Sequence, residues 1–199
     1  MIDKPKLTDR LNNIENIIST QNFRERGNSL GYYVFDYPPE SELIVREHLE
    51  SLVRKINDKN SGFEIKLFNI YEIIIQSLKD DGFLEMCKEM ESENDYEYLA
   101  DQIASVIDIS NNKSPIISNI IESVSESSIV FITGVGSAYP IIRGHNVLNS
   151  LAQSVDTIPV VMFYPGKYSG QDFKLFGTLP CDNYYRAVKF PDYSGQKIE

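Results

Sequence analysis

The sequence has few of the residues on which several common chemistries depend. Its 199 residues include two cysteines, Cys87 and Cys181, which are far apart and belong to no Cys-x-x-Cys pair. We therefore expect two reduced thiols, and neither a zinc site nor a disulfide framework. The two histidines, His48 and His145, have no set of Asp or Cys nearby at ligand spacing, so no metal site is predicted.

Long apolar runs and an excess of basic charge are also missing. No run approaches the roughly 20 apolar residues that span a bilayer, and the first residues, MIDKPKLTDR, contain no signal-peptide core. We therefore expect a cytoplasmic protein with no membrane contact. The formal net charge is −10, whereas nucleic-acid binding draws on a basic surface. Direct DNA binding is not expected, and the acidic surface suits solubility or docking onto a basic partner.

What the sequence does contain is an alternation of apolar runs and amphipathic stretches. The near-continuous apolar runs at 129–133 and 158–164 are typical of parallel strands that are buried on both faces. Residues 32–36 and 63–68 are further predicted strands, and residues 7–20 have the apolar spacing of an N-terminal helix. The pattern predicts one α/β domain over the whole chain, with a mostly parallel sheet of about five strands and helices on both faces.

Three further segments are expected around this sheet. Residues 83–125, between the second and third strands, are predicted to form a helical insert with a break in its acidic middle, Glu89–Asp95. Near the C-terminus, residues 173–176 and 184–190 are predicted to form a hairpin or an antiparallel edge. The polar tail at 192–199 is expected to be loose.

The most distinctive motif is the turn Thr133-Gly134-Val135-Gly136-Ser137, which follows a strand and precedes a helix predicted to open on Pro140. Backbone N–H groups at Gly134 and Gly136 can approach an anion closely. However, Tyr139 stands where a dinucleotide fingerprint needs glycine, and Gly166-Lys167 is followed by Tyr168 instead of a hydroxyl residue. The motif is therefore compatible with two interpretations, a plain strand-to-helix turn and a ligand-binding turn.

Four side chains are candidates to assist a ligand at this turn. Arg143, one turn inside the predicted helix, would reach a bound anion. Asp36 would lie near the turn if its strand neighbours the strand at 129–133, and it could then act as a magnesium ligand or general base. The alternative is that Asp36 caps the Pro38-Pro39 turn. Lys167 lies in a loop that suits a ligand, a partner or an ordinary β-turn. Ser137 has no identifiable base, which favours helix capping.

No complete catalytic set emerges from these residues. His145 shares a predicted helical face with Ile141, Leu148 and Ala152, which favours a packed histidine over a catalytic one. We therefore assign no catalytic residue, metal or cofactor, and we expect a protein that is not an enzyme.

Five stretches resemble a known family. They are FDYPPESELIVREHL, LFNIYEIII, FITGVGSAYPIIRGHNVLNSL, PVVMFYPGKYSGQDFKLFG and NYYRAVKF. In this order they resemble the BrxB family of bacterial BREX phage-resistance loci, formerly a domain of unknown function, from about residue 32 to residue 190.

The resemblance implies a role in a defence system more than a reaction. BREX systems discriminate host from phage DNA by methylation and block phage replication. The family's protein is expected to act beside a methyltransferase, an ATPase-like protein and an alkaline-phosphatase-like protein. The leading hypothesis is a non-catalytic adaptor that binds these proteins. The alternative is a nucleotide- or phosphate-binding enzyme that uses the turn at 133–137.

Overall fold

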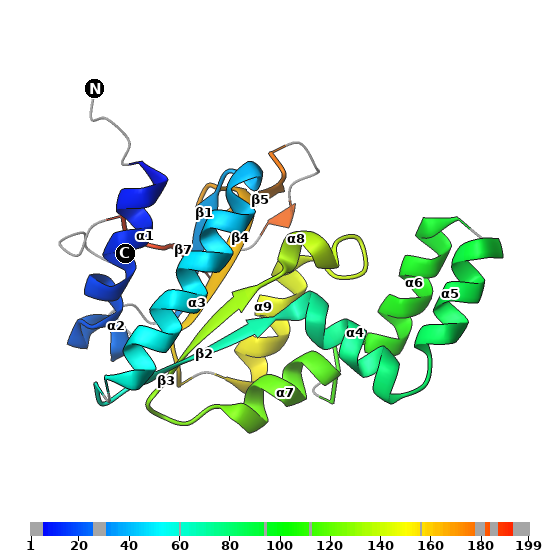
Figure 1. The fold of residues 1–199 in the computed structure, drawn as a ribbon, viewed down its shortest axis with the longest axis horizontal. Coiled ribbons are helices and arrows are strands. Elements are labelled where there is room, and N and C mark those ends of the chain that lie inside the picture. Colours follow the sequence, from blue (N-terminus) through cyan, green and yellow to red (C-terminus); the bar gives the residue numbers. More distant parts are fainter. Residues whose placement is uncertain are drawn as a thin grey trace.

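The computed structural model describes residues 6–25, 31–59, 61–93, 95–111, 113–155, 157–177, 182–183 and 187–192 (Figure 1). It confirms an α/β fold with a mostly parallel sheet. The strands are β1 (Tyr32–Tyr37), β2 (Glu64–Asn69), β3 (Ser128–Thr133), β4 (Val160–Tyr168), β5 (Asp172–Leu175), β6 (Asp182–Asn183) and β7 (Val188–Lys189). The helices are α1 (Leu7–Ile18), α2 (Gln21–Arg24), the 3-10 turn η1 (Pro39–Ser41), α3 (Glu42–Asp58), α4 (Ile70–Asp80), α5 (Leu84–Glu93), α6 (Tyr96–Ile107), α7 (Pro115–Ser123), α8 (Val135–Ala138) and α9 (Gly144–Ser154).

The strands follow the order β2-β3-β4-β1-β7 across the sheet, and all of these neighbours pair in parallel. Strand β4 lies at the centre, where Val160 pairs with Tyr32 of β1 on one side and with Val130 of β3 on the other. The end of β4 continues beyond the parallel sheet and pairs antiparallel with β5, which in turn pairs with β6. One strand therefore belongs to both parts of the sheet.

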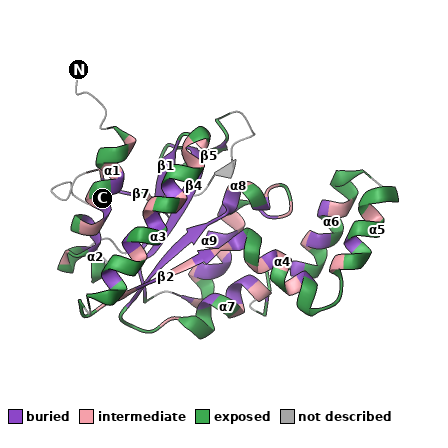
Figure 2. Cartoon of the chain, in the orientation of Figure 1, coloured by how far each residue is buried: buried purple, intermediate pink, exposed green. Residues whose placement is uncertain are grey.

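Helices cover both faces of the sheet, and each face has its own apolar core. The core under α1, α2 and α3 includes Leu49, and the core under α4, α7 and α9 includes Leu148. Neighbouring residues of β4 point into different cores, Val161 into the first and Met162 into the second, because side chains alternate along a strand. Figure 2 shows that the strands β1, β3 and β4 are buried along most of their length.

The predicted helical insert between the second and third strands is confirmed. Its helices α5 and α6 form a hairpin that projects from the body of the molecule beyond α4 (Figure 1). The predicted break in the acidic middle falls between Glu93 and Tyr96. Asp95 begins α6 as its N-cap, because its carboxylate accepts the backbone N–H of Tyr98 at 2.8 Å.

The antiparallel edge predicted near the C-terminus is present, and β4, β5 and β6 form it. Of the segment predicted at 184–190, residues 184–186 lie outside the described residues. Within the second segment, Val188–Lys189 forms β7, which joins the sheet in parallel beside β1. Of the predicted loose tail at 192–199, the part beyond Asp192 lies outside the described residues. No helix in the described ranges is long and apolar enough to cross a membrane.

Candidate functional site

Close packing explains both glycines of the turn after β3. Gly134 has a φ of +75°, and a Cβ at this position would lie 2.0 Å from Oδ1 of Asn69, the residue whose side chain caps α4. A Cβ on Gly136 would lie 2.8 Å from Cγ of Pro165 in β4 and 3.2 Å from the ring of Phe176. The glycines therefore let the turn lie against neighbouring side chains.

Two predicted placements beside this turn are wrong. The helix expected to open on Pro140 is α9, which begins at Gly144, so Arg143 precedes the helix in extended backbone instead of lying one turn inside it. Ser137 lies within the single turn of α8 and does not cap a following helix. The chain uses residues 139–143 as a connection between α8 and α9. A role for Arg143 or Ser137 in ligand binding stays a prediction.

Asp36 does not lie on a strand next to β3, because β4 separates β1 from β3. Its carboxyl group is 11% exposed and accepts hydrogen bonds from Arg10 Nη2 at 3.1 Å, Lys189 Nζ at 3.3 Å and the backbone N–H of Tyr168 at 3.2 Å. Arg10 also donates through Nε to Asp192 at 2.6 Å. Arg10, Asp36, Lys189 and Asp192 form what we call the edge charge cluster.

The edge charge cluster ties four parts of the chain together. It links α1, β1, β7 and Asp192, which lies three positions after β7, and the Tyr168 N–H adds the end of β4. The guanidinium of Arg10 also stacks over Phe35 at 4.4 Å from the ring centroid. Because these donors occupy the Asp36 carboxylate, its observed contacts are those of a structural ion pair, and they do not run to the Pro38-Pro39 turn.

A cleft of about 700 Å³ opens beside this cluster at the carboxyl edge of the sheet. It lies between the segment that leaves β1 toward α3 and the hairpin of β4 and β5. Ligands of open α/β sheets bind in the crevice outside the carboxyl ends of the strands. Of the predicted site residues, the cleft brings together Asp36 and Lys167; Gly134, Gly136, Ser137 and Arg143 do not line it.

The net charge of the residues that line this cleft is slightly positive, whereas that of the whole chain is negative. The charged lining residues are Arg10, Lys167, Lys174 and Lys189, which are basic, and Asp36, Glu40 and Asp172, which are acidic. Lys167 and Lys174 stand directly opposite each other in the β4–β5 ladder. Like charges in this position repel each other, so an anion bound between them would relieve the repulsion.

Sequence reasoning missed Arg10, Lys174 and Lys189 as members of this region. Arg10 has no distinguishing signal, because an arginine on the polar side of an amphipathic helix resembles any solvated charge. Lys174 does have a signal: it alternates with Phe173 and Leu175, which are buried, and this places its side chain on the opposite face of β5.

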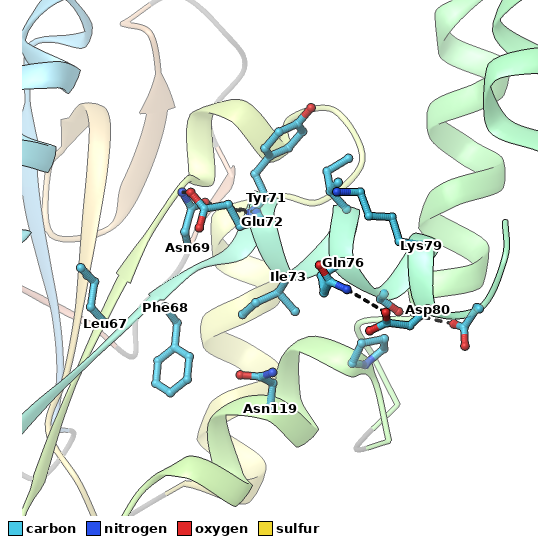
Figure 3. Close-up of a pocket in the computed structure, with 14 residues that line it drawn as sticks. Leu67, Phe68, Asn69, Tyr71, Glu72, Ile73, Gln76, Lys79, Asp80 and Asn119 are labelled. Carbon is cyan, nitrogen blue, oxygen red and sulfur yellow. Dashed lines mark hydrogen bonds between the residues drawn. The ribbon is translucent and has the colours of Figure 1, made fainter. Parts of the chain in front are cut away.

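A second cleft, of about 770 Å³, runs along α4 between the end of β2 and α7 (Figure 3). Its polar side chains bind one another: Gln76 donates to Asp80 at 2.7 Å, and Asn69 donates to Glu72 at 2.8 Å. Across the described residues, no three His, Cys, Asp or Glu side chains gather as a metal site requires. We assign no chemistry to this cleft.

Comparison with known proteins places the chain in a family. The sequence profile described as "BREX protein BrxB" matches residues 66–190. A "BREX protein BrxB" of Bacillus cereus (strain H3081.97) is 36% identical over 190 residues, which cover 94% of this chain and 98% of the relative. A protein of the same description from Escherichia coli O9:H4 (strain HS) is 35% identical over 198 residues, covering 96% and 95%. No solved structure matches the chain. These relatives confirm the resemblance seen in the sequence motifs, and the chain therefore belongs to the BrxB family of BREX proteins.

Proposed function

We propose that this BREX component is a non-catalytic adaptor that binds other proteins of its antiphage defence system. The observation that supports the proposal most is that three of the six candidate ligand-binding residues have structural roles. Asp36 is bound by two cations, and Gly134 and Gly136 lie against neighbouring side chains. The partners we expect are the alkaline-phosphatase-like protein, the ATPase-like protein and the methyltransferase of the same system.

Native co-purification tests the adaptor function. The tagged chain is expressed together with the other genes of its own system, captured without cross-linking, and its bound proteins are identified by mass spectrometry. At least one of the three expected partners is retained, whereas the untagged chain retains none. Recovery of the tagged chain without any of them would contradict the proposal.

A second candidate function is the binding of a nucleotide or another phosphate ligand, with or without catalysis. The cleft at the carboxyl edge supports it better than the turn at 133–137, because Lys167 and Lys174 line the cleft and stand opposite each other in the β4–β5 ladder, where a bound anion would relieve their repulsion. Thermal unfolding with ATP, GTP and inorganic phosphate, each with and without magnesium, tests it. A ligand at 100 times its dissociation constant stabilises the fold by about 2.7 kcal/mol.

The matched control for this measurement is the double variant Lys167→Gln/Lys174→Gln. Phosphate binding in the cleft predicts that the double variant loses the ligand-induced stabilisation. An unchanged unfolding temperature of the unsubstituted protein with every one of these ligands rejects this second function.

A further inference from the structure

The α5–α6 hairpin exposes apolar side chains that no other described element covers. Half of the large hydrophobic side chains that are exposed in the described ranges lie within residues 83–107, with exposed fractions between 37% and 67%. They are Phe83, Met86, Tyr96, Tyr98 and Val106. Single exposed apolar residues are normal on any protein, whereas several that gather together mark an interaction site. Five of them fall within these 25 residues of the chain.

The fold of the hairpin does not account for these exposed residues. Its two helices pack through a separate buried set, Cys87, Ala100, Ile103 and Ile107, and part of this set continues into the core around α4 and α7. The neighbours Val106 and Ile107 illustrate the division: Ile107 is fully buried, whereas Val106 is 43% exposed. The inner stripe holds the hairpin together, and the outer apolar residues are available for another contact.

The same hairpin concentrates the negative charge of the chain. Residues 83–107 contain seven acidic side chains and one basic one, which gives −6 of the formal net charge of −10. The acidic residues are Glu85, Glu89, Glu91, Glu93, Asp95, Glu97 and Asp101. The lysine, Lys88, pairs with Glu85 at 2.6 Å. The negative charge of Glu97 raises the pKa of the exposed Tyr96 hydroxyl, and the hydrogen bond between the two side chains raises it further.

These charges decide which partner fits the surface. Tyrosine, phenylalanine and methionine are enriched in the centres of protein interfaces, and an acidic rim favours a partner with complementary basic charge. Self-association through this surface would oppose six net negative charges with another six. A nucleic acid would be repelled for the same reason. The partner that satisfies both the apolar and the acidic groups is a different protein with a basic rim around an apolar patch.

We propose that the α5–α6 hairpin is the docking arm for such a basic protein surface within the BREX assembly. This inference rests on the proposed adaptor function and identifies the surface and the chemistry of one of its contacts. The hairpin projects from the body that contains the sheet (Figure 1), and its buried residues Cys87, Ile103 and Ile107 join the core on one face of that sheet.

Two full-length variants test the docking arm. Tyr96→Ala/Tyr98→Ala removes aromatic contacts, and Glu89→Lys/Glu91→Lys/Glu93→Lys reverses charges on α5. The matched controls are Leu43→Ala/Ile44→Ala on α3, which removes side chains that are at least as exposed on average, and Glu47→Lys/Glu122→Lys/Glu126→Lys, which reverses three exposed charges elsewhere. Circular dichroism and thermal unfolding verify that all four variants fold.

The probe is each purified BREX protein that co-purifies with the unsubstituted chain, with its affinity measured by calorimetry at several salt concentrations. Both hairpin variants are expected to bind at least about tenfold more weakly, whereas both controls bind as the unsubstituted chain does. The affinity of the unsubstituted chain falls as salt is raised, and the charge-reversed hairpin loses most of this salt dependence.

The outcomes separate the docking arm from the adaptor function. If the unsubstituted chain binds a BREX protein and the hairpin variants bind it equally well, the docking arm is overturned and the adaptor function stands. If the unsubstituted chain captures none of them, both fall. A dimer in analytical ultracentrifugation that the hairpin variants abolish would assign the surface to a second copy, and would also overturn the inference.

Discussion

The carboxyl edge of the sheet and the α5–α6 hairpin use their polar groups in opposite ways. At the edge, Arg10, Asp36, Lys189 and Asp192 bind one another and tie helix to strand. The hairpin segment, residues 83–107, contains seven acidic residues and a single lysine. Charges that are paired and shielded from water stabilise the fold only while the pairing is complete, whereas solvated charges mainly affect association. Substitutions at the edge should therefore destabilise the fold, and substitutions on the outside of the hairpin should leave its stability nearly unchanged.

The largest effect is expected at the edge charge cluster. Asp36→Asn breaks the largely buried pair with Arg10, and the free energy of unfolding should fall by about 3–5 kcal/mol, as for a broken buried ion pair. The half-exposed Lys189 should add little to this loss. Urea unfolding followed by circular dichroism measures it. Glu15→Gln is the control, because its pairs with Lys55 and Lys59 involve largely exposed lysines and should contribute no more than about 1 kcal/mol. Equal losses in the two variants would remove the distinction between the edge and the surface.

The next comparison lies within the hairpin itself. Ile107→Ala removes a fully buried side chain and should cost about 2–4 kcal/mol of unfolding free energy through lost burial and a cavity. Val106→Ala changes the adjacent, exposed residue and should alter stability by no more than about 0.5 kcal/mol. The same urea titration measures both. A large loss in Val106→Ala would mean that the outer residues do support the hairpin, against the proposed docking role.

A smaller effect is expected at the glycine turn. Gly134→Ala places a side chain at a positive φ and against Asn69, which must move from its capping position on α4, and a loss of about 2 kcal/mol is expected. Gly82→Ala is the matched control, because Gly82 has a φ of +73° but no atom within 4 Å of an added Cβ. Differential scanning calorimetry should show the larger decrease in Tm for Gly134→Ala. Equal decreases would mean that strain alone, and not the contact with Asn69, requires glycine in the turn.

The smallest effect is expected for His48, which lies on α3. Burial lowers the pKa of His48 below 6.5, and a hydrogen bond with the Leu11 backbone partly offsets this. Among the residues that the structure describes, Nε2 has no hydrogen-bond partner. The unfolded chain therefore takes up the proton first as the pH falls, and stability should decline as the pH falls below 6.5. This window begins above the range in which Glu15 and Glu64, whose pKa values are lowered by lysine partners, are protonated. His48→Leu should flatten the decline in urea midpoints across this window; an unchanged slope would contradict the assignment.

The strands could be predicted from the sequence because they contain runs such as Ile129–Ile132, in which every residue is apolar. Their order could not, since a strand that is buried on both faces has the same pattern at any interior position of a sheet. The misplacement of Asp36 follows directly from this: its partners Arg10 and Lys189 are 26 and 153 positions away in the chain. The two residues of β7 are too few to show a period.

The site was partly predictable for a similar reason. Lys167 and Asp36 were found because both follow apolar runs that end at the carboxyl edge, and the structure brings them to one cleft. Arg143 was misplaced because Pro140 is favoured in a first helical turn, whereas the chain begins α9 only at Gly144. The exposed residues of α5 and α6 have no signal of their own, since the sequence does not reveal whether another element covers an apolar side chain.

The central position of β4 has a consequence for synthesis of the chain on the ribosome. Tyr32 of β1 pairs with Val160 of β4, which is 128 positions later in the chain. Strand β3 pairs with β2 on one side, and it can pair on its other side only when β4 is present. Closing so long a segment delays native pairing. A growing chain that pauses before β4 emerges would present the apolar strand β1 with no β4 beside it, and such unpaired strands are sites of aggregation. Strand β1, in the first third of the chain, therefore stays exposed to aggregation until β4, in the last third, has been synthesised and can pair with it.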